Sequence, residues 1–294
     1  MLLAVAHGSR DAAASATIQL LLRRVRRLRP ELNVQCCFLD LNSPPLEEAL
    51  PQLAHRRPVV VPILLGTGYH LRVDIPAAVA AAGLPPSQVA RALGPHRLLA
   101  EALADRLAES GATREAPVVL AGAGSSDPTA VADTTRMASL LATHLGRPVT
   151  PAHLSAASPT PHEAVAALHS EGHREVAVAT YLLAPGFFAR RAATTEARWT
   201  SAPLAAHEAV ARLILHRYDE VRRRACELPR GRRARAVEDA PPKGGSLRNA
   251  LDHGNGRDAS TPQPTPATTR SSRCPQPPNV SPGCALLSGS PRNR

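Results

Sequence analysis

Aromatic side chains are scarce in this sequence, making up 2% of its 294 residues. Proteins that hold single-stranded nucleic acid stack its bases on aromatic rings, so nucleic-acid binding is not expected as the main role. The sequence also lacks a G-x-G-x-x-G motif and a P-loop ending in G-K-[ST], which argues against a nucleotide cofactor. No uninterrupted apolar run reaches membrane-spanning length, and the opening MLLAVAHGSR lacks the basic leader of a signal peptide. We therefore expect neither a nucleic-acid partner nor a membrane partner.

Cysteine is also sparse, with five residues and no C-x-x-C pair. Cys36 and Cys37 are adjacent, and on a strand they would point to opposite faces of the sheet. This spacing favours neither a disulfide framework nor a zinc site. Unpaired cysteines are typical of a reducing compartment, so we expect a cytoplasmic location.

Charge is unevenly distributed along the chain, whose formal net charge is +11. Residues 229–294 are rich in Pro, Gly, Ser, Thr and Arg, and hold 11 basic against 4 acidic residues. Because this segment has little apolar periodicity, we predict that it is a disordered tail. Residues 1–228 keep a net charge of +4, which suits binding of an anionic small molecule.

Apolar segments of the first hundred residues alternate between strand-like and helix-like patterns. The run PVVVPILL is continuous and bounded by Arg57 and Gly66, as is typical of a strand buried on both faces. The predicted strands are 2–6, 34–39, 58–65 and 90–93, and the predicted helices are 12–28, 45–55, 74–82 and 97–110. This order predicts an α/β fold with a small parallel sheet flanked by helices.

The same order then returns, which indicates an internal repeat. LLGTGYHLR (64–72) aligns with LLAPGFFAR (182–190) at an offset of about 118 residues, and HGSRD (7–11) aligns with AGSSD (123–127) at about 116. We predict two similar domains, 1–112 and 113–228, followed by the tail 229–294. If the halves pack face to face, one chain imitates a homodimer, so a monomer is expected.

Candidate metal-ligating residues follow the strands of the first half. His7 follows the first predicted strand, Asp40 the second and His70 the third. Carboxyl ends of parallel strands meet at one edge of a sheet, where ligands bind. The second half has Ala123 and Phe188 at the two histidine positions, as expected for a site that operates once per chain. Each histidine taken alone is equally well explained as a cap or a turn residue.

The motifs AHGSRD, FLDLNSPPLEEAL, VVVPILLGTGYHLRVDIP and ALGPH together resemble the sirohydrochlorin chelatases of the CbiX/SirB type, which are class II chelatases. The resemblance is good over about 1–109 and weaker through about 227. It implies insertion of Fe²⁺ or Co²⁺ into sirohydrochlorin, for sirohaem or cobalamin synthesis, with no cofactor beyond the substrate metal. It also implies that His7 and His70 are the catalytic, metal-binding pair. The family often has Glu where Asp40 stands, so Asp40 either binds the metal or supports the site.

The chemistry of metal insertion agrees with these residue types. A neutral imidazole can bind a divalent ion or accept a pyrrole proton. We predict His70 as the principal metal ligand and His7 as proton acceptor or second ligand, although the sequence does not rank these assignments. The acetate and propionate arms of the substrate are expected to meet Arg10 and Arg72, with Ser9 as a further contact.

Two other functions fit parts of the pattern. A metal or tetrapyrrole carrier would use the same pocket without turnover. A histidine phosphatase would use His7 and Arg10, but such enzymes usually show R-H-G, and here Ala6 precedes His7.

Overall fold

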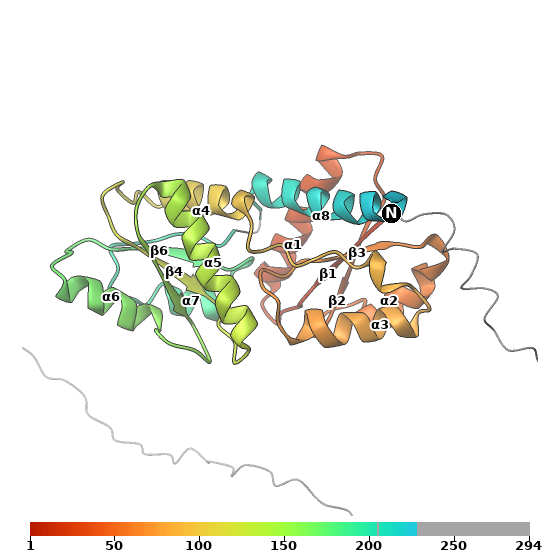
Figure 1. Ribbon diagram of the computed structural model, residues 1–294, viewed down its shortest axis with the longest axis horizontal. Helices are drawn as coiled ribbons and strands as arrows, with labels where there is room; N and C mark the ends of the chain where they lie inside the picture. Colours follow the sequence, from red (N-terminus) through yellow and green to blue (C-terminus); the bar gives the residue numbers. More distant parts are fainter. Residues whose placement is uncertain (205, 228–294) are drawn as a thin grey trace, which may run out of the picture. The chain divides into compact units, whose positions relative to one another are not determined.

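Two parallel β-sheets, one in each half, form the framework of the chain (Figure 1). The computed structural model describes residues 1–204 and 206–227, and the tail predicted at 229–294 lies outside them. The first sheet has the order β2-β1-β3 and the second the order β5-β4-β6-β7, with every pair parallel. The strands are β1 (Leu2–Ala6), β2 (Val34–Phe38), β3 (Val59–Pro62), β4 (Val118–Gly122), β5 (Val149–His153), β6 (Ala177–Tyr181) and β7 (Trp199–Thr200). The predicted α/β fold with two similar halves is confirmed.

Helices flank both sheets and follow from local sequence signals. Helix α1 begins after Asp11, whose side chain accepts a hydrogen bond from the Ala13 amide, and buries an apolar stripe that includes Leu21 and Val25. Asp127 caps α5 in the same way. The helices are α1 (Ala12–Leu28), α2 (Leu46–Leu53), α3 (Ile75–Ala81), α4 (Arg97–Glu109), α5 (Pro128–Leu145), α6 (Pro161–Ser170), α7 (Phe187–Ala192) and α8 (Glu208–Glu227).

The last helix of each half packs against the other half. Helix α4 lies against α5 and β6, whereas α8 lies against α1 and β3 (Figure 1). One hydrophobic cluster therefore runs through both halves, from Leu2 on β1 to Leu120 on β4 and Val210 on α8. Because the halves share this core, the described residues form one compact unit. The boundary at 112/113 stays a prediction.

The first sheet has one strand fewer than the sequence pattern predicts. The segment 90–93 is not a strand; it runs beside β3 through the bonds Ala90 N to Val60 O and Leu93 N to Leu64 O, both 2.8 Å. Pro62 of β3 has no N–H to donate, so a continuous ladder cannot form along this side. The strand predicted at 58–65 accordingly ends at Pro62.

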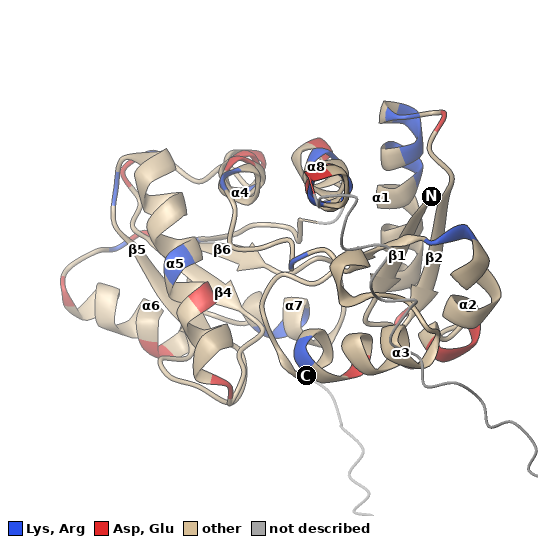
Figure 2. Cartoon of the chain, turned by 45° about the vertical axis from the view of Figure 1, so that its right-hand side comes forward, with Lys and Arg blue, Asp and Glu red and all other residues tan. Residues whose placement is uncertain are grey.

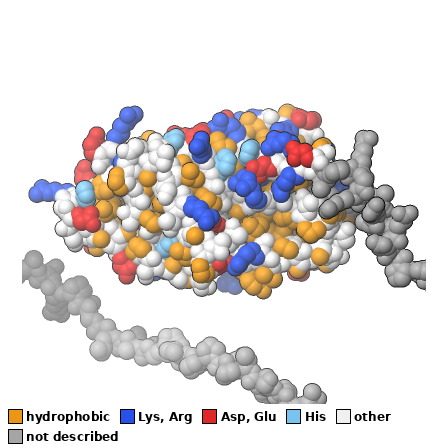
Figure 3. Space-filling view, in the orientation of Figure 1, with side chains coloured by type: hydrophobic (Ala, Val, Ile, Leu, Met, Phe, Trp, Pro, Cys, Tyr) orange, Lys and Arg blue, Asp and Glu red, His pale blue; other side chains and the backbone are white. Residues whose placement is uncertain are grey.

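None of the described helices combines the length and the apolar character that a membrane span needs. On the face shown in Figure 3, hydrophobic, basic and acidic side chains are interspersed.

Candidate active site

A cavity of about 860 Å³ lies where the two halves meet, at the carboxyl ends of their strands. Its lining comes from the turns that follow β1, β3, β4 and β6. This is the sheet edge at which parallel α/β folds bind ligands, and the volume is in the range of about 300–1,000 Å³ typical of small-molecule sites. Much of the wall is apolar and includes Ile18, Ile63 and Leu182. Such a wall favours a ligand with a large apolar surface.

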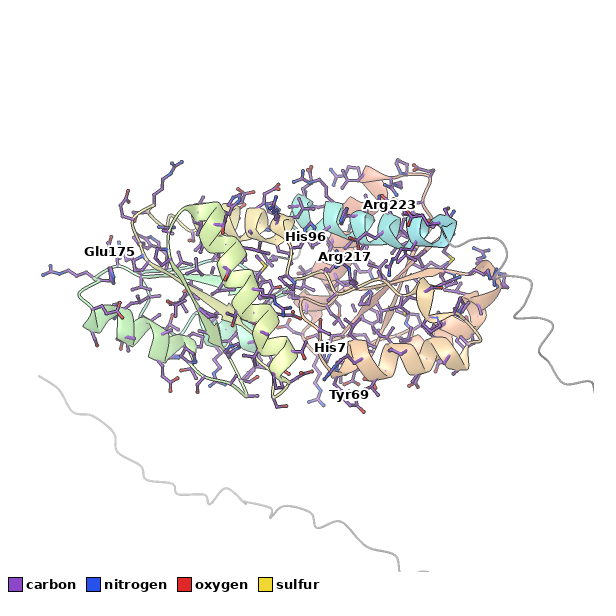
Figure 4. All side chains as sticks on the ribbon, in the orientation of Figure 1. His7, Tyr69, His96, Glu175, Arg217 and Arg223 are labelled. Atoms are coloured by element: carbon purple, nitrogen blue, oxygen red, sulfur yellow. The ribbon has the colours of Figure 1, made fainter. Side chains whose placement is uncertain are left out.

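Both histidines expected from the sequence line this cavity and contact each other. The ring centroids of His7 and His70 are 4.7 Å apart, with the ring planes at 85°. His7 is exposed and His70 is partly exposed, so both rings are accessible from the cavity. Figure 4 shows the side chains of His7 and Tyr69, the residue next to His70, close together at this edge. Two imidazoles 63 residues apart in sequence thus meet in space.

His70 begins a single π-helical turn, His70–Asp74, that leads into α3. The sequence pattern predicts a helix only from residue 74, because one widened turn leaves no trace in apolar periodicity. The turn brings Nδ1 of His70 to 2.6 Å from Oδ2 of Asp74. A carboxylate can only accept, so Nδ1–H donates, and the neutral ring keeps its free lone pair on Nε2. Asp74 therefore fixes the orientation and the tautomer of the His70 ring.

His7 is held by a tight turn at the end of β1. The amide of Asp40 donates to the carbonyl of His7 at 3.0 Å. Gly8 has φ +98, and a Cβ there would lie 1.8 Å from the carbonyl oxygen of Asp40, so only glycine fits. The Ser9 amide donates to the Asn42 side chain at 2.6 Å. The main chain of residue 40, rather than its carboxylate, thus fixes the position of His7.

The Asp40 side chain does not lie with the two histidines on the cavity wall, which favours the supporting role over the metal-binding one. Its side chain accepts from the Leu41 amide at 2.8 Å, and Asp40 is exposed and absent from the cavity wall. Within residues 1–204 and 206–227, no three His, Cys, Asp or Glu side chains gather as a metal site. The short aspartate side chain is engaged locally by the backbone, so the two histidines lie together without it.

The expected substrate-binding residues divide between the cavity and its surroundings. Ser9 and Arg10 line the cavity. The Ser9 hydroxyl already accepts from the Asp11 amide at 3.1 Å, whereas Arg10 is exposed. Arg72 is not part of the wall and pairs with Asp127. Its counterpart in the repeat, Arg190, does line the cavity. Arg190 is not among the substrate-binding residues expected from the sequence, although the alignment of LLGTGYHLR with LLAPGFFAR pairs it with Arg72.

The second half supports the loop that carries His70. Buried Asp133 on α5 accepts from the Thr67 amide at 2.9 Å, and the hydroxyl of Tyr181 on β6 donates to the Leu65 carbonyl at 3.0 Å. Burial, with the Asp133 charge nearby, raises the pKa of Tyr181, which keeps it a donor. No local sequence signal reveals these roles, because they depend on how the halves pack.

Known proteins match the chain over most of its described length. The model of the family described as CbiX matches residues 1–110 and again 117–221. A sirohydrochlorin ferrochelatase from Priestia megaterium is 29% identical over 192 residues, 62% of this chain and 72% of that protein. A sirohydrochlorin cobaltochelatase from the same organism is 28% identical over 200 residues, 64% of this chain and 65% of that protein. The structure of SirB from Bacillus subtilis with Fe³⁺ matches with a TM-score of 0.65 and 25% identity, over 77% of this chain and 97% of that one.

Proposed function

Because the chain belongs to the CbiX family, we propose that it inserts a divalent metal ion, Fe²⁺ or Co²⁺, into sirohydrochlorin. The observation that carries the proposal is the pair of imidazoles, His7 and His70, whose rings lie 4.7 Å apart on the wall of an 860 Å³ cavity. The names of the relatives, a ferrochelatase and a cobaltochelatase, support the same reaction with either metal.

The reaction exchanges two pyrrole protons for one metal ion. Four ring nitrogens replace the water and protein ligands of the metal, and the two N–H protons leave to a base. A chelatase must hold the ion with few protein ligands, because closed four-ligand sites are structural whereas sites with open positions react. Two histidines leave most coordination positions for the incoming nitrogens. Imidazole also suits borderline ions such as Fe²⁺ and Co²⁺.

We assign the principal metal-ligand role to His70. Its contact with Asp74 places the ring proton on Nδ1, which leaves the Nε2 lone pair free and directed away from the carboxylate. His7, whose ring meets that of His70 edge to face, acts as the second ligand or as the acceptor of a pyrrole proton. In this proposal the apolar wall packs against the macrocycle, and Arg10 and Ser9, which line the cavity, bind its carboxylate arms.

The family relationship also bears on how the chain is organised. We infer a monomer in the cytoplasm, built of a first half over 1–112 and a second half over 113–228. The core shared by the two halves and the free thiols of Cys36 and Cys37 support this inference. Light scattering of the purified chain tests this inference, because a monomer has a mass close to 31.0 kDa.

The direct test mixes the purified chain with metal-free sirohydrochlorin and Co²⁺ and follows the visible absorbance of the macrocycle. We expect the spectral change to be faster than in a matched solution without protein, and its rate to rise in proportion to protein concentration. A chain that binds sirohydrochlorin and Co²⁺ but gives only the protein-free rate is a carrier, and the enzyme proposal is then wrong. Hydrolysis of a generic phosphate ester would point instead to phosphatase chemistry.

A further inference from the structure

Two ion pairs join the halves, and their residues correspond in the repeat. Arg190 Nη1 donates to Asp11 Oδ2 at 3.1 Å, and Arg72 pairs with Asp127. Arg72 and Arg190 are counterparts in LLGTGYHLR and LLAPGFFAR, and Asp11 and Asp127 are counterparts in HGSRD and AGSSD. The same contact is therefore made twice, with the roles of the halves exchanged.

Each aspartate uses its two oxygens for different partners. Oδ1 of Asp11 accepts from the Ala13 amide at 3.0 Å, and Oδ1 of Asp127 accepts from the Thr129 amide at 2.9 Å. Oδ2 of each faces the arginine of the other half. Asparagine in place of either aspartate keeps an oxygen for the helix cap and removes the charge that the arginine meets.

The two ion pairs differ in their position: Asp11 and Arg190 line the cavity, whereas Arg72 and Asp127 do not. The Arg190 side chain is 70% exposed and that of Asp11 is 28% exposed. Helix α7 carries Arg190 toward the region between the halves, where Figure 2 shows basic residues on this helix. The hydrogen bond from Arg190 lowers the pKa of Asp11, so the carboxylate is ionised at neutral pH. An exposed pair of this kind is weak and exchanges readily with another anion.

We propose that Arg190 binds a carboxylate arm of the tetrapyrrole, and that Asp11 occupies its guanidinium while the cavity is empty. This rests on the proposed function, which supplies a substrate with several carboxylate arms. On entry, one arm replaces the Asp11 carboxylate on the planar guanidinium, which favours paired hydrogen bonds to a carboxylate. The second half, which lacks the histidines, thus contributes a substrate contact, and Asp11 weakens binding by competing for it.

The test measures the affinity for metal-free sirohydrochlorin from its own fluorescence, and KM and kcat for Co²⁺ insertion. We expect Arg190→Gln to raise Kd and KM about tenfold with little change in kcat, as for loss of one charge-assisted contact. Arg190→Lys, which keeps the charge, should restore part of the affinity. Arg191→Gln, on the same helix but outside the cavity wall, is the matched control and should bind as the wild type does.

The aspartates give a second, opposite comparison. Asp11→Asn should lower Kd several-fold, because the internal competitor loses its charge, whereas Asp127→Asn should leave Kd unchanged. The inference is overturned if Arg190→Gln keeps the wild-type Kd and KM, or lowers kcat alone. Failure of the proposed function looks different: the wild type would then insert no metal, although the binding titration could still be read. Circular dichroism verifies that each variant is folded.

Discussion

Removing the carboxylate that orients His70 should weaken metal binding strongly. In the wild type, Asp74 Oδ2 lies 2.6 Å from His70 Nδ1 and holds the ring in one tautomer. Loss of such outer partners typically reduces metal affinity about 10- to 100-fold, which corresponds to about 1.4–2.7 kcal/mol. We expect Asp74→Ala to lose metal affinity in this range. Asp74→Asn should lose less affinity, because its amide oxygen can still accept from Nδ1–H.

Calorimetric titration of the metal-free chain with Co²⁺ measures this effect. Asp105→Ala is the matched control, because Asp105 lies 3.1 Å from His207 in a similar contact away from the cavity. The control should bind Co²⁺ as the wild type does. If folded Asp74→Ala also binds Co²⁺ with wild-type affinity, the orientation of His70 does not depend on Asp74, and the assignment of Nε2 as the ligand loses its support.

Three further predictions concern the framework around the site. Arg217, labelled in Figure 4, is 3% exposed, pairs with Glu220 and donates to two backbone carbonyls. Its change to Met should lower the free energy of unfolding by about 3–5 kcal/mol, and a loss under about 1 kcal/mol in urea unfolding would contradict this. Burial lowers the pKa of His96 to about 4 in the folded chain, whereas the pKa of an ordinary histidine in the unfolded chain is about 6.5. The unfolded chain therefore takes up the proton first, so the free energy of unfolding falls as the pH drops from about 6.5 to about 4. His96→Asn keeps a capping side chain, and its free energy of unfolding should fall less between pH 7 and pH 4.5 than that of the wild type. An equal fall in both proteins would show that His96 does not cause the loss of stability. Gly8→Ala drives a Cβ into the Asp40 carbonyl at positive φ, so it should destabilise the chain by at least about 1 kcal/mol and slow insertion, and wild-type behaviour in both assays would show that the turn adjusts freely.

Local patterns predict the elements whose signals lie within their own sequence. Helix α1 spans the predicted 12–28, because an aspartate cap and a regular apolar stripe define it. The meeting of His7 with His70 also follows from strand order, since both residues follow strands of one parallel sheet. The predicted strand at 90–93 is wrong because its partner strand contains Pro62, which interrupts the ladder.

Other features depend on packing between the halves and cannot be read from local patterns. One such feature is the packing of α4 and α8, each against the opposite half, which brings both halves into a common core. The anchoring of the His70 loop by Asp133 and Tyr181 is another. Asp40 is the instructive case, because it stands at the right edge of the sheet while its carboxylate bonds to the next amide in the chain. Topology thus predicts which residues come near the site but not which way each side chain turns.

Metal insertion by the separate variants His7→Ala and His70→Ala tests the central claim most directly. Rates are measured with sirohydrochlorin and Co²⁺ at saturating substrate, and His55→Ala, an exposed histidine outside the cavity, is the control. We predict that each site variant stays folded and loses about 10²- to 10⁴-fold in rate, while the control keeps the wild-type rate. Wild-type rates in both folded site variants would contradict a two-histidine site.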